Sequence, residues 1–104
     1  MVNNKTILSE IKKAICEIDE SAQVILFGSR ARGDFKKESD WDILILTEQK
    51  VTRSLEKLFF QKILFLEMKY EIGVSSVIRN RKEWIDIFSF TPFYAEVEKD
   101  GMLI

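Results

Sequence analysis

The chain has 104 residues, and its 16 lysines and arginines against 17 aspartates and glutamates leave a net charge of −1. This length fits a single domain over residues 1–104 that buries a core without disulfides or metal. The near balance of charge disfavours a nucleic-acid partner, and the absence of histidine excludes a histidine base and the zinc sites that use one.

The first part of the chain predicts a helix followed by a strand. Apolar residues spaced by three and four predict a helix over residues 6–19, whose stripe consists of Leu8, Ile11, Ile15 and Ile18. Residues 22–27 are mostly apolar and end at Gly28, which is typical of a strand buried on both faces.

A polar loop separates this strand from a second one. Residues 28–39 hold two glycines and many charges, which predicts a loop with room for a helical turn from Ser29. Residues 41–46 are apolar except for Asp42 and predict a second buried strand.

The middle of the chain predicts a helix and a third strand. Apolar residues recur at helical spacing over residues 52–68, and Thr52 is placed to cap this helix. Residues 69–78 predict a strand that carries Tyr70 and Ile72 on one face and Glu71 on the other.

The last part predicts a short helix over residues 81–90 that buries Trp84, Ile85 and Phe88. Pro92 ends it, because proline disfavours a helical conformation in the preceding residue. Residues 93–104 are expected to form a closing segment with a turn at Asp100-Gly101. This order of elements predicts an α/β protein with one small mixed sheet and helices packed against it.

No part of the sequence suggests a membrane partner. No segment approaches the ~20 apolar residues of a membrane span, and the first ten residues show no signal-peptide pattern. We therefore expect a cytoplasmic protein.

Asp40-Trp41-Asp42 stands at the entry to the second strand. Side chains two apart on a strand share a face, so the carboxylates point the same way, about 7 Å apart along the backbone. Like charges this close repel unless a divalent metal or a basic group neutralises them. Mg²⁺ binds carboxylate oxygens together with substrate phosphates. If the pair is considered alone, the alternative is an acidic strand end that is simply exposed to water. Trp41 points the other way and is predicted to lie in the core.

Gly28-Ser29 marks the exit from the first strand. A glycine lets a phosphate approach the backbone, while the Ser29 hydroxyl and nearby amides donate hydrogen bonds. Arg30 follows, and its guanidinium suits bidentate contact with phosphate oxygens, with a solvated surface position as the alternative. A plain turn explains Gly-Ser alone, but ten intervening residues lead to Asp40-Trp41-Asp42, which places a phosphate-accepting turn beside a metal-binding pair.

This spacing resembles the signature of the minimal nucleotidyltransferases of the polymerase-beta-like superfamily, which is glycine-serine, ten residues, then Asp-x-Asp. Residues 26–34 and 39–45 look like family sequence almost throughout, and the rest resembles the family in length and element order. The resemblance implies the family's compact α/β fold, an NTP donor and Mg²⁺, with two ions expected. It also implies that Gly28 and Ser29 hold the triphosphate while Asp40 and Asp42 ligate metal.

The family often has a third carboxylate on a later strand, which ligates metal and deprotonates the attacking hydroxyl. Glu71 is the candidate for this position, and a surface glutamate at a strand edge is the alternative. A domain without that acid would bind nucleotide and leave the transfer in doubt.

Small members of this family commonly act with a separate helical protein of the HEPN type, as the antitoxin that adenylylates it. The resemblance therefore implies transfer of AMP from ATP to a hydroxyl on such a partner. Two alternatives remain: an inactive nucleotide-binding module that neutralises its partner by contact, and a small-molecule (antibiotic) nucleotidyltransferase.

Overall fold

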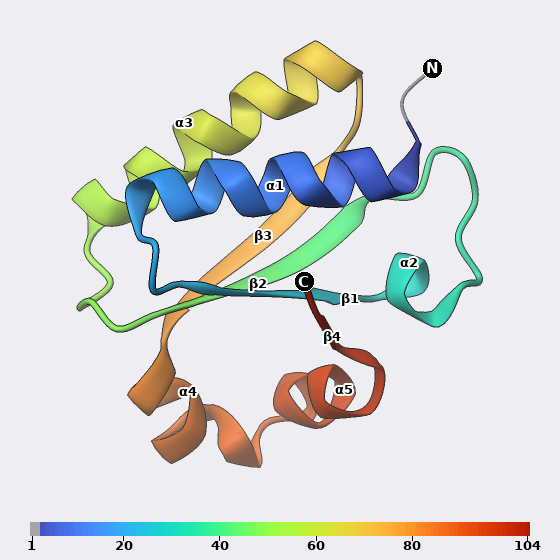
Figure 1. Cartoon of the computed structure of the whole chain (residues 1–104). Helices are drawn as coiled ribbons and strands as arrows, with labels where there is room; N and C mark the ends of the chain where they lie inside the picture. The colour runs from blue at the N-terminus through green and yellow to red at the C-terminus, as the bar shows by residue number, and fades with distance from the viewer. Residues whose placement is uncertain (1–2) are drawn as a thin grey trace.

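In the computed structural model, which describes residues 3–104, a mixed sheet with strand order β3-β2-β1-β4 lies between two layers of helices (Figure 1). The strands are β1 (Gln23–Phe27), β2 (Trp41–Thr47), β3 (Val74–Asn80) and β4 (Met102–Leu103). β1 is antiparallel to β2 and to β4, whereas β2 and β3 are parallel. The predicted α/β class and mixed sheet are confirmed.

Helices α1 (Asn4–Ile18) and α3 (Arg53–Tyr70) lie side by side over one face of the sheet (Figure 1). Thr52 caps α3 as predicted, because its hydroxyl accepts a hydrogen bond from the Leu55 amide. The core between this layer and the sheet includes Trp41, Ile43, Ile45, Phe59 and Ile63. Within residues 3–104, no helix is both long and apolar enough to cross a membrane.

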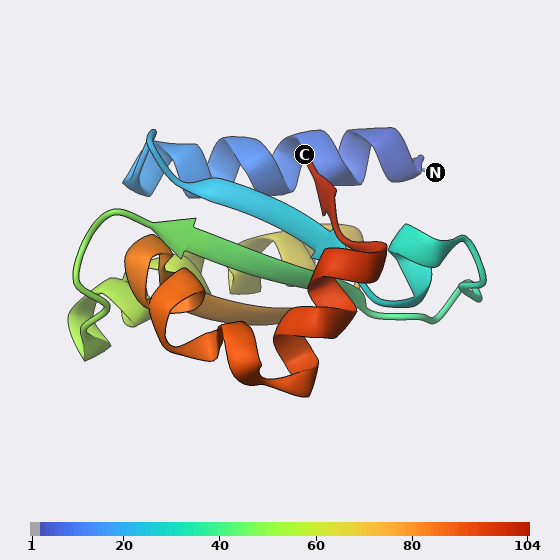
Figure 2. The same ribbon diagram turned by 90° about the horizontal axis from the view of Figure 1, so that it is seen from below.

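The opposite face is covered by α4 (Arg81–Asp86), the 3-10 helix η1 (Phe88–Phe90) and α5 (Pro92–Asp100) (Figure 2). Trp84 is buried at the centre of this layer, with ring centroids 5.5 Å from Phe93 and 4.9 Å from Tyr94. The prediction of one helix over residues 81–90 was wrong in two respects: the helix breaks after Asp86, and Ile85 is exposed.

The closing segment is also different from the prediction, because residues 92–100 form helix α5. Pro92 occupies the first position of α5, where a missing amide hydrogen costs nothing, and the Thr91 side chain accepts a hydrogen bond from Tyr94 N. Pro92 therefore ends one helical segment and begins another. Gly101 follows α5, and β4 then pairs with β1.

The third strand begins later than predicted. Helix α3 continues to Tyr70, and Glu71 is its C-cap in the left-handed conformation (φ 54°), with its amide bonded to Glu67 O. The Glu67 carboxylate accepts a hydrogen bond from Val74 N at 3.1 Å, which fixes the start of β3 beneath the end of α3. Glu71 thus lies at a helix end and not on a strand.

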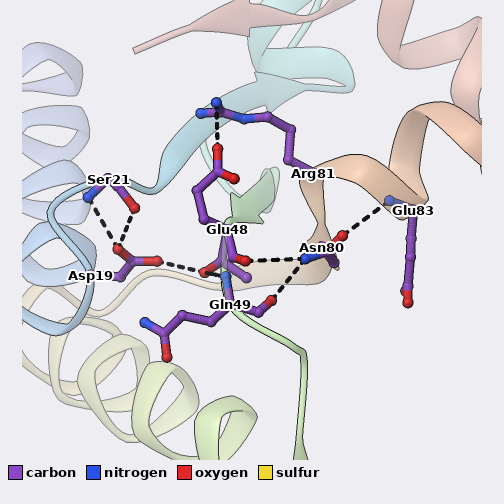
Figure 3. Close-up of polar contacts among 8 residues, drawn as sticks. Asp19, Ser21, Glu48, Gln49, Asn80, Arg81 and Glu83 are labelled. Atoms are coloured by element: carbon purple, nitrogen blue, oxygen red, sulfur yellow. Dashed lines mark hydrogen bonds and ion pairs between the residues drawn. The ribbon is translucent and has the colours of Figure 1, made fainter.

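A polar network with buried Asp19 and Thr47 at its centre lies at the end of β2 opposite Asp40 (Figure 3). Asp19 is 8% exposed and accepts hydrogen bonds from Thr47 Oγ1 (2.5 Å), Ser21 Oγ (2.7 Å) and Ser21 N (3.1 Å). Asn80, at the end of β3, donates to the Gln49 carbonyl oxygen at 3.0 Å. Burial raises the pKa of Asp19, but the hydrogen bonds outweigh it and hold the pKa below the usual range.

Candidate active site

The pairing of β1 with β2 brings the glycine turn to the carboxylates. Phe27 is the partner of Asp42 in the antiparallel register, so Gly28 comes directly after the last pair. Asp42 lies on the face of the sheet that carries Leu44 and packs against the α4 and α5 layer, whereas Trp41 is 2% exposed in the opposite core. The predicted core position of Trp41 is confirmed.

Each carboxylate lies against the backbone of a glycine. A Cβ atom on Gly28 would overlap Oδ2 of Asp42, and a Cβ atom on Gly73 would overlap Oδ1 of Asp40. Gly28 also has φ +74°, a conformation that L side chains rarely adopt. The two glycines therefore leave the space in which both carboxylates approach the backbone. The role of Gly73 was not recognised from the sequence, although a glycine inside the strand predicted over residues 69–78 is a signal for close approach to the backbone.

Helix α2 (Ser29–Arg32) begins at the turn. The Arg32 and Gly33 amides donate to the carbonyl oxygens of Gly28 and Ser29, at 3.1 and 2.9 Å. The amides of Ser29 and Arg30 stand at the start of the helix, where no preceding turn supplies an acceptor. The Ser29 hydroxyl and these amides are donors of the kind that bind phosphate.

Arg30 is bound within the protein. Its Nε donates to Ser39 O at 3.0 Å and its Nη2 to Lys37 O at 3.2 Å. The guanidinium also lies over the Trp41 ring, with Cζ 4.1 Å from the centroid. Burial lowers the Arg30 pKa, and the nearby Asp40 charge opposes this. Arg30 thus secures residues 37–39, the backbone immediately before Asp40. A phosphate contact by Arg30 stays a prediction.

The negative charge of the carboxylate pair is only partly offset by nearby arginines. Burial raises the pKa of Asp42 above its usual range, and the charge of Asp40 raises it further. Arg32 opposes this shift, while Glu96 on α5 adds to it. None of the ion pairs found within residues 3–104 involves Asp40 or Asp42.

These two carboxylates fit a hard divalent cation such as Mg²⁺, because oxygen ligands and substrate phosphates together complete its shell. A third acidic ligand is not found: in the described part of the chain, no group of three Asp, Glu, His or Cys side chains is placed to hold a metal. Glu71, predicted on the third strand, lies at the α3 C-cap instead. The β3 residue opposite Asp42 is Ser75.

Arg32 links the site to the last helix, a contact the sequence did not indicate. Its guanidinium forms ion pairs with Asp34 (3.2 Å) and with Asp100 at the end of α5 (3.7 Å). The second pair joins segments far apart in the chain, which explains why local patterns did not reveal it. The end of α5 thus lies beside α2 (Figure 2).

The mixed sheet, the glycine-serine turn and the Asp-x-Asp pair on adjoining strands define a nucleotidyltransferase. The sequence matches the family described as nucleotidyltransferase domain over residues 8–100, and the chain belongs to this family. The protein is therefore an enzyme of the nucleotidyltransferase type, as the sequence resemblance implied.

A relative from Methanocaldococcus jannaschii, named "Putative protein adenylyltransferase MJ0141", is 39% identical over 98 residues, which cover 92% of this chain and 93% of the relative. A chain of a toxin-antitoxin crystal structure with AMP-PNP aligns with a TM-score of 0.65 at 18% identity, over 91% of this chain and 69% of that chain. A chain from the structure of a tri-AMPylated Shewanella oneidensis HEPN toxin in complex with MNT antitoxin aligns with a TM-score of 0.61 at 16% identity. The alignment covers 95% of this chain and 69% of that chain. At these identities the two structures show a shared fold.

Proposed function

We propose that this protein transfers AMP from ATP to a hydroxyl group on a small helical partner of the HEPN type, and so acts as its antitoxin. The observation that carries the proposal is the approach of Asp40 and Asp42 to the backbones of Gly73 and Gly28. The name of the Methanocaldococcus relative and the AMPylated HEPN toxin in one structural neighbour support the choice of AMP and of the partner.

In the proposed site, the Gly28-Ser29 turn binds the triphosphate through backbone amides and a hydroxyl. Asp40 and Asp42 would hold Mg²⁺, which when bound neutralises charge on the phosphates. The acceptor oxygen forms a bond to the α-phosphorus while the bond to the β-phosphate breaks. Pyrophosphate leaves, and the hydroxyl proton passes to solvent.

The test is labelling of a purified HEPN-type protein from a neighbouring gene with α-³²P-ATP and Mg²⁺. The double variant Asp40→Asn/Asp42→Asn should abolish the label, because neutral amides neither attract nor anchor the cation. Glu20→Gln is the control, since Glu20 is exposed at the other end of the sheet. Equal labelling by the double variant would exclude this mechanism.

A second candidate function is favoured because residues 3–104 place no third acid beside Asp40 and Asp42. With Glu71 at a helix end and Ser75 opposite Asp42, the domain would bind ATP and neutralise its partner by contact. In that case the wild-type protein would leave the partner unlabelled, and Asp40→Asn/Asp42→Asn would still suppress its toxicity. Loss of both label and protection in the double variant would favour the enzyme.

A further inference from the structure

Helix α3 presents a second apolar face, away from the core. Its buried side chains include Phe59 and Ile63, yet five large apolar residues on its outer side are exposed: Leu58, Phe60, Leu64, Phe65 and Met68. A groove of about 350 Å³ runs along part of this face, lined by Arg53, Glu56, Lys57, Phe60, Gln61 and Leu64. Exposed apolar area concentrated on one helix is typical of an interface.

The strand beneath α3 has an open edge. β3 pairs with β2 on one side, and within residues 3–104 no strand pairs with its other side. It contains neither proline nor lysine, the residues that commonly protect such edges. Two backbone groups on this edge already have partners: Val74 N donates to the Glu67 carboxylate, and Ile78 O accepts from Arg79, whose guanidinium lies over the Phe88 ring (4.8 Å). Between them, the backbone of Ser76 faces outward without a strand partner within residues 3–104.

Positive charges lie before the apolar pair Phe60 and Leu64 on α3, and negative charges lie at matching distances after it. Spacings of four and three residues define a seam along the helix, consisting of Arg53, Lys57, Phe60, Leu64 and Glu67, and Glu71 follows at the C-cap. One carboxylate oxygen of Glu67, Oε2, accepts from Val74 N, so Oε1 is the oxygen that would face a partner. Two cations precede the apolar pair and two anions follow it, with the midpoint at position 62. An antiparallel copy of the same seam would set Lys57 against Glu67 and Arg53 against Glu71, with Phe60 facing Leu64.

Ideal rises per residue put the midpoint of the seam and the midpoint of β3 at roughly the same level. The Glu67 carboxylate bonds to Val74 N at 3.1 Å, which aligns the two elements there. From that contact, position 62 is five helical residues away, about 8 Å. Val77, the centre of β3, is three strand residues away, about 10 Å. One two-fold axis can therefore pass close to both centres.

We propose that α3 and the open edge of β3 form a two-fold interface with a second copy of this chain. The two β3 strands would pair antiparallel, and the two α3 helices would pack over the junction along the seam. Such an interface is self-complementary, as two-fold symmetry requires. It joins the two sheets into one and closes both open β3 edges.

The position of this surface separates it from the catalytic reaction. Asp42 lies on the face covered by α4 and α5, whereas α3 covers the opposite face (Figure 1). The apolar centre of the seam, Phe60 and Leu64, therefore lies on the other side of the sheet from the Asp42 carboxylate, and only its Glu71 end comes near Gly73 and Asp40. The interface is independent of the proposed acceptor and of whether transfer occurs.

The test is the oligomeric state of the full chain, measured by sedimentation equilibrium over a range of concentrations. The wild-type chain should be a dimer, and Leu64→Glu should weaken association at least about 100-fold by burying two carboxylates at its centre. Phe65→Glu is the matched control, because Phe65 is similarly exposed but lies roughly 100° around the helix from Leu64. It should leave the dimer intact.

Charge reversal tests the register. Arg53→Glu and Glu71→Arg should each weaken self-association by about threefold to tenfold, and an equimolar mixture should regain it as a heterodimer. Hydrogen exchange of the β3 amides should slow as the wild-type dimer forms, but not in Leu64→Glu. Three results would overturn the proposal. The chain could be monomeric at every concentration, the dimer could be broken by Phe65→Glu but not by Leu64→Glu, or the seam could bind only a different protein.

Discussion

At the scale of single residues, Gly73 and Gly28 set the positions of the two carboxylates. Gly73→Ala should reduce transfer by about 100-fold, because its Cβ would overlap Asp40 Oδ1 and displace the carboxylate. Gly28→Ala should reduce it as well and cost about 1–3 kcal/mol of unfolding free energy, since φ is +74° there. Initial rates and urea unfolding measure the two effects.

Gly33→Ala is the control for both variants. Gly33 also has a positive φ (+89°), but a Cβ there meets no atom within 4 Å. It should lose about 1 kcal/mol of stability and keep its activity. A Gly73→Ala variant with the wild-type rate would show that the position of Asp40 is not critical.

Arg30 offers a second prediction at this scale. Because its guanidinium bonds to Ser39 O and Lys37 O, Arg30→Ala and Arg30→Lys should both lower the rate at saturating ATP and weaken Mg²⁺ binding. Lysine keeps the charge but cannot reproduce the planar pair of donors. A raised KM for ATP with an unchanged kcat would instead assign Arg30 to the phosphates, as the sequence suggested.

At the scale of elements, the sequence predicted the helices and strands that have a sustained apolar pattern. It did not predict where α3 ends or that α5 begins at Pro92. Helices α1 and α3 and strands β1 and β2 follow from apolar spacing, within a few residues of their ends. The end of α3 was misplaced because alternation near Tyr70 imitates a strand, while the deciding contact is the bond from Val74 N to Glu67. Helix α5 was missed because Pro92 was taken as an end only.

Asp19, between α1 and β1, gives a prediction about how the stability of the protein depends on pH. Hydrogen bonds lower the Asp19 pKa in the folded state, so its contribution to stability is complete above the pKa of the unfolded chain, about 4. That contribution is lost as the pH falls through the lower folded pKa. Asp19→Asn should therefore cost about 1–2 kcal/mol at pH 7 and progressively less below pH 4.

Urea unfolding from pH 7 to pH 3 measures this difference. Glu20→Gln is the neighbouring control, because Glu20 is exposed and should change stability little at any pH. A constant difference between wild type and Asp19→Asn across this range would mean that the charge of Asp19 does not stabilise the network in Figure 3.

At the scale of the whole molecule, the sequence predicted half of the candidate site. Gly28, Ser29, Asp40 and Asp42 follow from one local spacing, because an antiparallel pair of strands brings the two ends of a short loop together. The surroundings of the pair depend on β3 and on helix α5, which are distant in sequence. Strand β3 and the turn before it place Gly73 against Asp40 and Ser75 opposite Asp42. Neither position could be predicted without knowing the register of β3 against β2.

That register yields the last prediction, which adds a carboxylate beside Asp40 and Asp42. Ser75 is exposed and lies opposite Asp42 on the same face of the sheet, so Ser75→Asp would place a third carboxylate beside the pair. Without metal, repulsion among the three charges should lower the Tm, and Mg²⁺ should raise it more than in the wild type. Transfer should increase about tenfold or more if a base limits the rate. Ser75→Asn has the same shape without the charge, so it should change neither the response of the Tm to Mg²⁺ nor the rate of transfer. An equal gain in rate from Ser75→Asn would show that a third carboxylate is not what limits transfer.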